Sequence, residues 1–238
     1  MKNRRFDRRT FLKSAIAGSA TAASVTLPQT GQTQQKPAAP AASPPASPGY
    51  AYLNLEEQAF IETLVDHMVP ADELSPKGTD IGINIYIDRA LAGGWGKGER
   101  LYMQGPWKQG APSQGYQLPL TPAELYRAGI KAANAYCVKT YGNTFDRIPE
   151  NQRQEFLLAL QAGKVSFEGG LPSRIFFTTV YQNVMEGMFS DPIHGGNRNK
   201  AGWKMIGFPG IVAVHAQNVD KFKDRKYTAD PISIADMS

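Results

Sequence analysis

The segment from Asp191 to Gly210 has the sequence DPIHGGNRNKAGWKMIGFPG and holds the residues of this chain that are best suited to chemistry. His194 is a potential general base, and Asp191, three residues earlier, is a potential partner for its ring or for a substrate. A base of this kind also needs a substrate proton or a nucleophile within hydrogen-bond reach, which spacing does not establish. An autonomous enzyme that uses His194 and Asp191 on a small substrate is therefore one interpretation of the segment.

The same residues have a structural interpretation. Glycine pairs adopt backbone conformations that other residues avoid, asparagine caps helices well, and Trp203 with Phe208 can bury the turn. The basic and aromatic groups that remain have a composition that is enriched at protein interfaces. The segment thus also predicts a docking surface for another protein. Its candidate residues are His194, Gly195, Gly196, Asn197, Arg198, Trp203 and Lys204, together with Trp95 and Trp107 from an earlier segment.

The rest of the sequence lacks the motifs of a self-sufficient enzyme. With Cys137 as the only cysteine, a C-x-x-C-H haem site and an iron–sulfur cluster are both excluded. No G-x-G-x-x-G follows an expected strand, and no G-x-x-x-x-G-K-[ST] occurs, so the phosphate cradles of nucleotide-binding folds are missing. The histidines, at positions 67, 194 and 215, do not have the spacing of a helical metal site. We therefore expect no catalytic, cofactor-binding or metal-binding residue in this chain, and we expect Cys137 to be buried.

The net charge of +5 does not indicate a nucleic-acid-binding protein, because it is concentrated at one end. Residues 1–49 contain seven basic residues and Asp7 as their only acid. The remaining residues contain 19 basic and 20 acidic side chains and are close to neutral. A basic phosphate-binding face consequently has no support from the charge of the main part.

Residues 1–27 have the pattern of an export signal. A basic start precedes a weakly apolar stretch and then small residues that suit a signal peptidase. Arg8, Arg9, Phe11, Leu12 and Lys13 resemble the twin-arginine motif, whose pathway exports folded proteins. We therefore expect this chain to meet the twin-arginine translocase and to reach the periplasm. Residues 28–49, rich in Pro, Ala, Ser and Gln, have the composition of a linker.

Helix signals recur along residues 50–238. Asn54 with Glu57 forms a potential capping box, and Thr121 with Glu124, on either side of Pro122, forms another. Apolar residues follow at intervals of three and four, which is the spacing of one helical face. These signals predict helices that begin near positions 54, 80, 121, 149, 172 and 200. The expected buried face of the third consists of Leu125, Ala128, Ala132 and Tyr136.

Two stretches are less clear in sequence. Residues 80–91 (DIGINIYIDRAL) have one apolar helical face, but their alternating isoleucines also fit a strand. Residues 93–120 are rich in glycine, proline and aromatic residues without periodicity, which favours a long ordered loop or part of an interface. Since no hairpin turn or strand ladder is evident, we predict an all-α fold, an irregular helical bundle with long loops over residues 50–238.

Two segments resemble a known family. Residues 53–96 and, more specifically, GMFSDPIHGGNRNKAGWKMIGFPG at residues 187–210 resemble the gluconate 2-dehydrogenase subunit 3 family. The likeness, supported by the twin-arginine start, covers roughly residues 50–215 and leaves the tail at 215–238 unassigned. Members of this family are the small gamma subunits of periplasmic sugar and sugar-acid dehydrogenases that associate with the inner membrane.

The resemblance implies partners for this chain. In such complexes a large subunit binds FAD and oxidises gluconate or a related substrate, and a cytochrome c subunit with haem c passes the electrons to quinone. The small subunit has no cofactor of its own and is thought to carry the large subunit through the twin-arginine translocase. The resemblance therefore favours a non-catalytic subunit that assists export, assembly and stability, and it does not specify the substrate.

A direct prediction follows from the missing motifs. The purified chain, separated from any partner, should show no visible absorbance from flavin or haem and no sugar-oxidising activity. Absorption spectroscopy and a dye-reduction assay with gluconate measure both properties. Stoichiometric flavin on the isolated chain would contradict the prediction.

Overall fold

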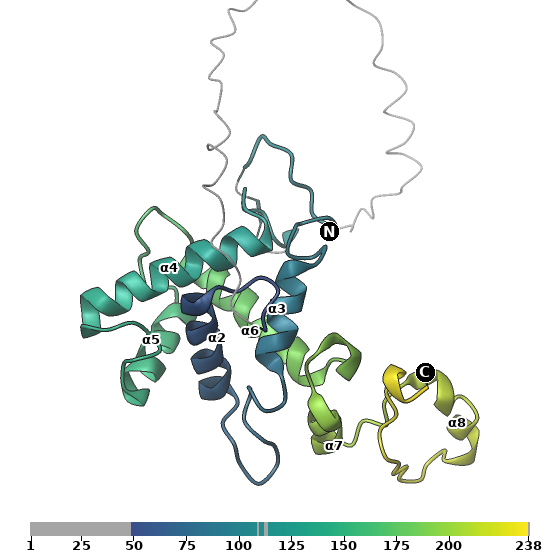
Figure 1. Cartoon of the computed structure of the whole chain (residues 1–238). Helices are drawn as coiled ribbons and strands as arrows, with labels where there is room; N and C mark the ends of the chain where they lie inside the picture. The colour runs from purple at the N-terminus through teal and green to yellow at the C-terminus, as the bar shows by residue number, and fades with distance from the viewer. Residues whose placement is uncertain (1–48, 109, 112–113, 238) are drawn as a thin grey trace, which may run out of the picture. The chain divides into compact units, whose positions relative to one another are not determined.

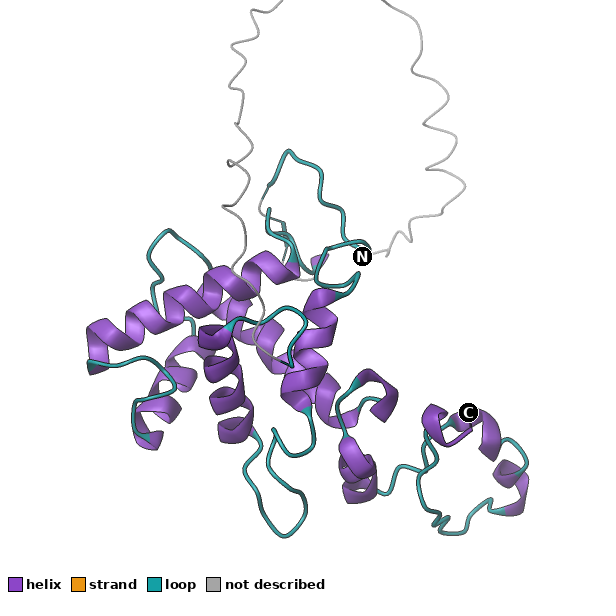
Figure 2. Cartoon of the chain, in the orientation of Figure 1, coloured by secondary structure: helices purple, strands orange, loops and turns teal. Residues whose placement is uncertain are grey.

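The computed structural model of the chain describes residues 49–237, except residues 109 and 112–113. Within this part every regular element is helical, and the only β-type pairing is an isolated bridge between Gly210 and Ile232 (Figure 2). The all-α prediction is therefore confirmed. The predicted signal peptide and, apart from Gly49, the predicted linker lie outside the described residues.

Five longer helices form the main helical group, and a series of short ones follows along the chain (Figure 1). The long helices are α2 (Leu55–Met68), α3 (Ile83–Ala92), α4 (Pro122–Tyr141), α5 (Glu150–Gln161) and α6 (Ser173–Phe189). Helix α6 contacts α3, α4 and α5 and is thus the central element. The short elements are η2 (Pro192–His194), η3 (Arg198–Lys200), α7 (Ala201–Ile206), η4 (Val212–His215), α8 (Asn218–Lys221) and η5 (Ile234–Met237).

The helices begin where the sequence signals place them. The Asn54 side chain accepts hydrogen bonds from Glu57 N at 3.0 Å, while Asn54 N donates to the Glu57 carboxylate. Thr121 and Glu124 form the same reciprocal box at the start of α4. Helix α3 begins after Gly82, which has a φ of +83°, a value that glycine adopts without strain. The isoleucine-rich stretch is therefore a helix rather than a strand.

Aromatic rings fill the centre of the helical group. The ring of Phe145 lies between those of Phe60 and Phe156, with centroid distances of 4.7 Å to Phe60 and 5.8 Å to Phe156. Phe176 of α6 packs against Phe60, with 6.4 Å between the centroids. Tyr126 is fully buried, and its hydroxyl donates to the Asn183 amide oxygen at 2.7 Å. The one polar atom of this core cluster is thereby satisfied, as burial requires.

The buried face of α4 differs from the predicted one. Ala132 and Tyr136 are only half-buried, whereas Gly129, Ala133 and Cys137, one position further round the helix, are buried. The reason is Gly129, because a Cβ there would overlap the Phe176 ring, so the glycine draws the helix against α6. A pattern count that looks for large apolar residues overlooks a glycine that serves as a packing surface.

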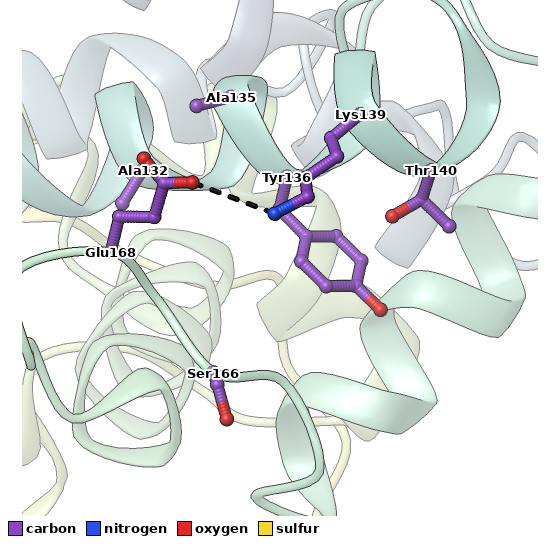
Figure 3. A pocket seen from close by; sticks show the side chains of 7 residues that line it. All are labelled: Ala132, Ala135, Tyr136, Lys139, Thr140, Ser166 and Glu168. Atoms are coloured by element: carbon purple, nitrogen blue, oxygen red, sulfur yellow. Dashed lines mark ion pairs between the residues drawn. The ribbon is translucent and has the colours of Figure 1, made fainter.

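The half-buried side of α4, which carries Ala132 and Tyr136, borders an open pocket of about 340 Å³ (Figure 3). An exposed ion pair, Lys139 Nζ to Glu168 Oε1 at 3.7 Å, lies at its edge. Screened pairs of this kind contribute little energy, and the pocket contains no histidine or cysteine. We assign it no chemistry. Its lining residues are Ala132, Ala135, Tyr136, Lys139, Thr140, Ser166 and Glu168.

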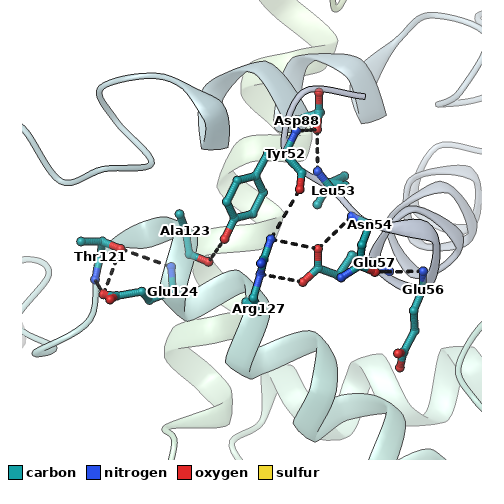
Figure 4. A network of polar contacts seen from close by, with 10 residues as sticks. All are labelled: Tyr52, Leu53, Asn54, Glu56, Glu57, Asp88, Thr121, Ala123, Glu124 and Arg127. Carbon is teal, nitrogen blue, oxygen red and sulfur yellow. Dashed lines mark hydrogen bonds and ion pairs between the residues drawn. The ribbon is translucent and has the colours of Figure 1, made fainter. Parts of the chain in front are cut away.

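The start of the described chain is fixed to α3 by one buried carboxylate (Figure 4). Asp88 accepts three backbone hydrogen bonds, from Ala51 N at 2.7 Å and from Tyr52 N and Leu53 N at 2.9 Å each. Its side chain is almost completely buried. Charged acceptors form hydrogen bonds about twice as strong as neutral ones. The carboxylate therefore holds residues 51–53 against helix α3.

Arg127 of α4 extends the same network (Figure 4). Its Nε lies 3.0 Å from Glu57 Oε1, and its guanidinium lies 4.5 Å from the centre of the Tyr52 ring. The Tyr52 hydroxyl in turn donates to Ala123 O at 2.8 Å. Burial raises the pKa of Glu57, while the charge of Arg127 opposes that shift. The entering segment, α2, α3 and α4 are thus joined at one polar junction.

Two further predictions can be compared with the structure. Cys137 is buried as predicted, and burial raises the pKa of its thiol to about 12, so the side chain is not a nucleophile at neutral pH. In the described part of the chain, no helix combines the length and apolar character that a membrane crossing needs.

The three hydrogen bonds to Asp88 lead to a stability prediction. Replacing Asp88 by Asn turns one acceptor atom into a donor that faces backbone N–H groups, which should lower the free energy of unfolding by about 2–3 kcal/mol. Thermal or urea unfolding followed by circular dichroism measures the change. The control is Asp80→Asn at an exposed position, which should stay within about 0.5 kcal/mol of the parent. Equal free energies of unfolding of the two variants would show that the Asp88 carboxylate does not stabilise the fold in this way.

Candidate functional site

The segment from Gly195 to Gly202 lies against the backbone of α6. A Cβ on Gly196 would overlap the carbonyl oxygen of Gly187, and one on Gly202 would overlap that of Met188. At the other side, a Cβ on Gly82, just before α3, would overlap Gly195 O. No larger residue fits at these positions without a shift of backbone. The segment therefore joins the end of α6 to the start of α3.

Asn197 is the polar centre of this junction and is completely buried. Its amide nitrogen donates to Ser190 O at 2.8 Å, and its amide oxygen accepts from Gly202 N at 2.8 Å. Next to it, Arg198 N donates to Ile81 O at 2.9 Å. The sequence prediction that Asn197 caps the following helix is correct in its effect, because Gly202 N belongs to the first turn of α7. Asn197 is not itself the N-cap residue of α7, however, because Lys200 occupies that position.

Three non-glycine residues of this turn have left-handed backbones. The φ angles are +48° at Asn197 and +56° at both Asn199 and Lys200. Asparagine tolerates this region better than most residues, but each such residue costs about 1 kcal/mol or more. Strain of this kind persists where the surroundings determine the conformation, which here they do through the bonds of Asn197.

Trp203 belongs to the core of this segment rather than to its surface. It is 5% exposed, and its indole N–H donates to Phe189 O at 2.7 Å. The Phe208 ring packs on it edge-on, with 5.3 Å between centroids. The part of the docking hypothesis that assigned surface contacts to Trp203 therefore does not agree with its burial. Gly196 and Asn197 are also buried and support the shape of the segment.

The family described as "Gluconate 2-dehydrogenase subunit 3" matches the chain over residues 55–210. The chain belongs to this family. No curated protein and no solved structure matched the chain. The family match ends at Gly210, which is the last residue of the glycine-rich segment described above, and it includes helices α2 to α7. The family is a subunit of an oxidoreductase complex, which implies partner subunits.

The surface of this subunit 3 chain at the segment is basic. His194, Arg198 and Lys204 are exposed, as the docking hypothesis requires, and Gly195 is half-buried between them. The other two predicted tryptophans lie on separate elements. Trp95 is 38% exposed and meets Tyr126 of α4 edge-on, and Trp107 is half-buried in the loop before α4.

Asp191 does not orient His194 for catalysis. Its two carboxylate oxygens accept from Ile193 N at 3.0 Å and from Ile234 N at 2.9 Å, and only its backbone oxygen bonds to His194, through the backbone N–H. A general base normally has a second group that fixes its ring. Over the described residues, no group of three or more histidine, cysteine or carboxylate side chains is placed to hold a metal ion.

Helix α3 supplies site residues that sequence reasoning missed. An open groove of about 540 Å³ lies between α3 and the turn at residues 190–194. Arg89 is exposed at this groove, and Tyr86 lies one turn earlier on the same helix. Both precede the family's most specific segment by about a hundred residues, and nothing in their spacing connects the two. The glycine contacts and the bond from Arg198 N to Ile81 O bring α3 beside the segment.

The C-terminal tail, which the resemblance left unassigned, is tied to the same segment. Lys200 Nζ donates to Asp236 Oδ2 at 2.6 Å and to Pro231 O at 3.0 Å. The bond from Lys200, together with those from Ser233, lowers the pKa of Asp236 to about 2. Any stability from this pair is therefore present above the usual aspartate pKa near 4 and is lost as the pH falls toward 2.

His215 has a structural role. The ring is half-buried and lies with its Nε2 3.1 Å from Pro209 O and its Nδ1 3.1 Å from the Tyr227 hydroxyl. His67 likewise lies in the last turn of α2 and bonds to Gln154 at 2.8 Å. Neither histidine lines the groove at residues 190–194.

The buried amide of Asn197 gives the testable prediction for this site. Asn197→Ala leaves Ser190 O and Gly202 N without their partner, which should lower the free energy of unfolding by about 3 kcal/mol or more. Asn199→Ala is the matched control, because Asn199 has the same left-handed backbone but an exposed side chain, and it should lose only about 1 kcal/mol. Urea unfolding measures both. Equal losses would show that backbone strain, and not the amide bridge, determines the stability of the turn.

Proposed function

We propose that this chain is the non-catalytic small subunit of a membrane-associated, FAD-dependent dehydrogenase complex of the gluconate 2-dehydrogenase type. In this role it assists the export, assembly and stability of a flavoprotein large subunit, with FAD in that subunit and haem c in a cytochrome subunit. The observation that carries the proposal is the structure of the segment at residues 191–210. Its glycines at 196 and 202, with Asn197 and Trp203, form a buried support for the backbone, and its exposed residues include His194, Arg198 and Lys204.

The contacts at this segment do not favour the alternative of an autonomous enzyme. Such an enzyme requires His194 to be oriented by a neighbour, and the carboxylate of Asp191 is already used by two backbone N–H groups. The buried thiol of Cys137 offers no second nucleophile.

The export part of the proposal rests on the arginine pair of the sequence. A periplasmic protein that folds before transport can carry a bound partner with it, and the twin-arginine pathway transports folded proteins. Residues 8–13 supply the motif, and residues 28–49 supply a linker between the motif and the helical domain. We therefore propose that the flavoprotein binds to the folded helical domain in the cytoplasm and crosses the membrane with it.

The proposal predicts that export of the two proteins is coupled. Changing both Arg8 and Arg9 to Lys should retain this chain and its flavoprotein partner together in the cytoplasm. Cell fractionation with immunoblots of both proteins measures the outcome. The chain provides its own control, since Arg4 and Arg5 form a second arginine pair whose change to Lys should leave export intact. Normal periplasmic levels of the flavoprotein beside a retained small subunit would refute the carrier role.

A further inference from the structure

Two arginines without an ion pair to the described residues lie at the groove between α3 and the turn at residues 190–194: Arg89 lines it, and Arg198 lies beside Gly82 at the start of α3. Arg89 and Arg198 are both exposed, and both side chains reach the backbone of the glycine-rich turn. A Cβ built on Gly195 would lie 3.1 Å from Nη1 of Arg89, and one on Gly82 would lie 2.9 Å from Nε of Arg198. Neither guanidinium forms an ion pair with a carboxylate of the described residues.

Among the described residues, the two acids nearest the groove make no ion pair with either arginine. Both oxygens of Asp191 accept backbone N–H bonds, one from its own turn and one from Ile234 in the tail. Glu186 of α6 accepts from the Tyr86 hydroxyl at 3.2 Å and from Asn183 at 3.0 Å. The guanidinium groups therefore remain available to a carboxylate from outside the chain.

The groove also offers apolar surface beside these charges. Ile193 is 49% exposed, which is unusual for an isoleucine held in a well-ordered turn, and Ala90 lies on the opposite wall. Arginine and exposed apolar groups at the edge of a concave surface are typical of protein interfaces. The lining residues are Tyr86, Arg89, Ala90, Ser190, Asp191, Ile193 and His194.

We infer that this groove binds an acidic segment of the partner flavoprotein. Carboxylates of that segment pair with Arg89 and Arg198, and an adjacent apolar side chain packs on Ile193. Arginine suits this role because its planar guanidinium binds a carboxylate through two parallel hydrogen bonds. The inference rests on the proposed function and adds the chemistry by which the partner is recognised.

The chain's own N-terminal residues do not fit this groove by charge. Residues 1–48 contain seven basic residues and a single acid, Asp7, so they are repelled by the same arginines. A second copy of this chain has a nearly neutral helical part, so its net charge does not favour it as an acidic occupant. A partner with an acidic segment is the occupant that charge complementarity selects.

Charge reversal in the assembled complex tests this inference. The chain is coexpressed with its flavoprotein partner, and the dissociation constant is measured with Arg89→Glu, Arg198→Glu and the double variant. Each single variant should weaken binding about tenfold or more, and rising salt should weaken the parent complex in the same direction. Arg174→Glu, an exposed reversal at the start of α6, is the matched control and should bind like the parent. Melting curves of the free variants, with Arg89→Gln as a milder change, separate loss of binding from loss of folding.

Crosslinking identifies the occupant directly. A photoreactive amino acid at Ile193 should capture one flavoprotein segment that contains at least two Asp or Glu residues. Replacing those acids by Lys should restore binding to the double variant with glutamates at 89 and 198. Capture of a second copy of this chain, capture of a segment without acids, or reversals that behave like the Arg174 control would overturn the inference. If the variants at 89 and 198 bind the flavoprotein as tightly as the parent does, the proposed function stands and only the inference about the groove is wrong. If the parent chain forms no complex with the flavoprotein, both the inference and the proposed function are wrong.

Discussion

The carbonyl oxygens near the end of α6 and the backbone of residues 195–202 approach each other more closely than any side chain on the segment would allow. Gly196 and Gly202 make this contact on α6, and Gly82 makes its counterpart at the start of α3. Because backbone meets backbone, the amide groups at the contact have no access to water and need internal partners. Asn197 supplies them for Ser190 O at the end of α6 and for Gly202 N in α7. The contact thus joins α7 to the end of α6 and to the start of α3.

Sequence patterns predicted the helices well where local chemistry decides them. The capping boxes at Asn54 and Thr121 specify starts through bonds between residues three positions apart, which a sequence displays directly. The prediction was wrong about the buried face of α4, because a glycine packs by its absence of a side chain. The docking hypothesis counted Trp203 among its contact residues for a different reason. Its partner, the carbonyl oxygen of Phe189, is 14 residues away and is specified by no pattern.

The candidate site was predictable only in part. Residues 191–204 were recognised as one segment, and the exposure of His194, Arg198 and Lys204 agrees with a docking surface. The opposite wall of the groove comes from α3, and its contribution depends on a tertiary contact between residues about a hundred positions apart. Likewise, the link between Lys200 and Asp236 joins the tail to this segment, although the tail has no recognisable motif.

The attachment of residues 51–53 to Asp88 has a mechanical consequence. Tension applied to the chain from its N-terminal side first reaches Tyr50, whose hydroxyl is bonded to Glu62 of α2 and Asn84 of α3, and then these residues. Three hydrogen bonds to one carboxylate share that load, and the Tyr52 hydroxyl adds a connection to α4. The load is therefore distributed over α2, α3 and α4 together. A domain held in this way can be pulled by its N-terminal end as one folded body.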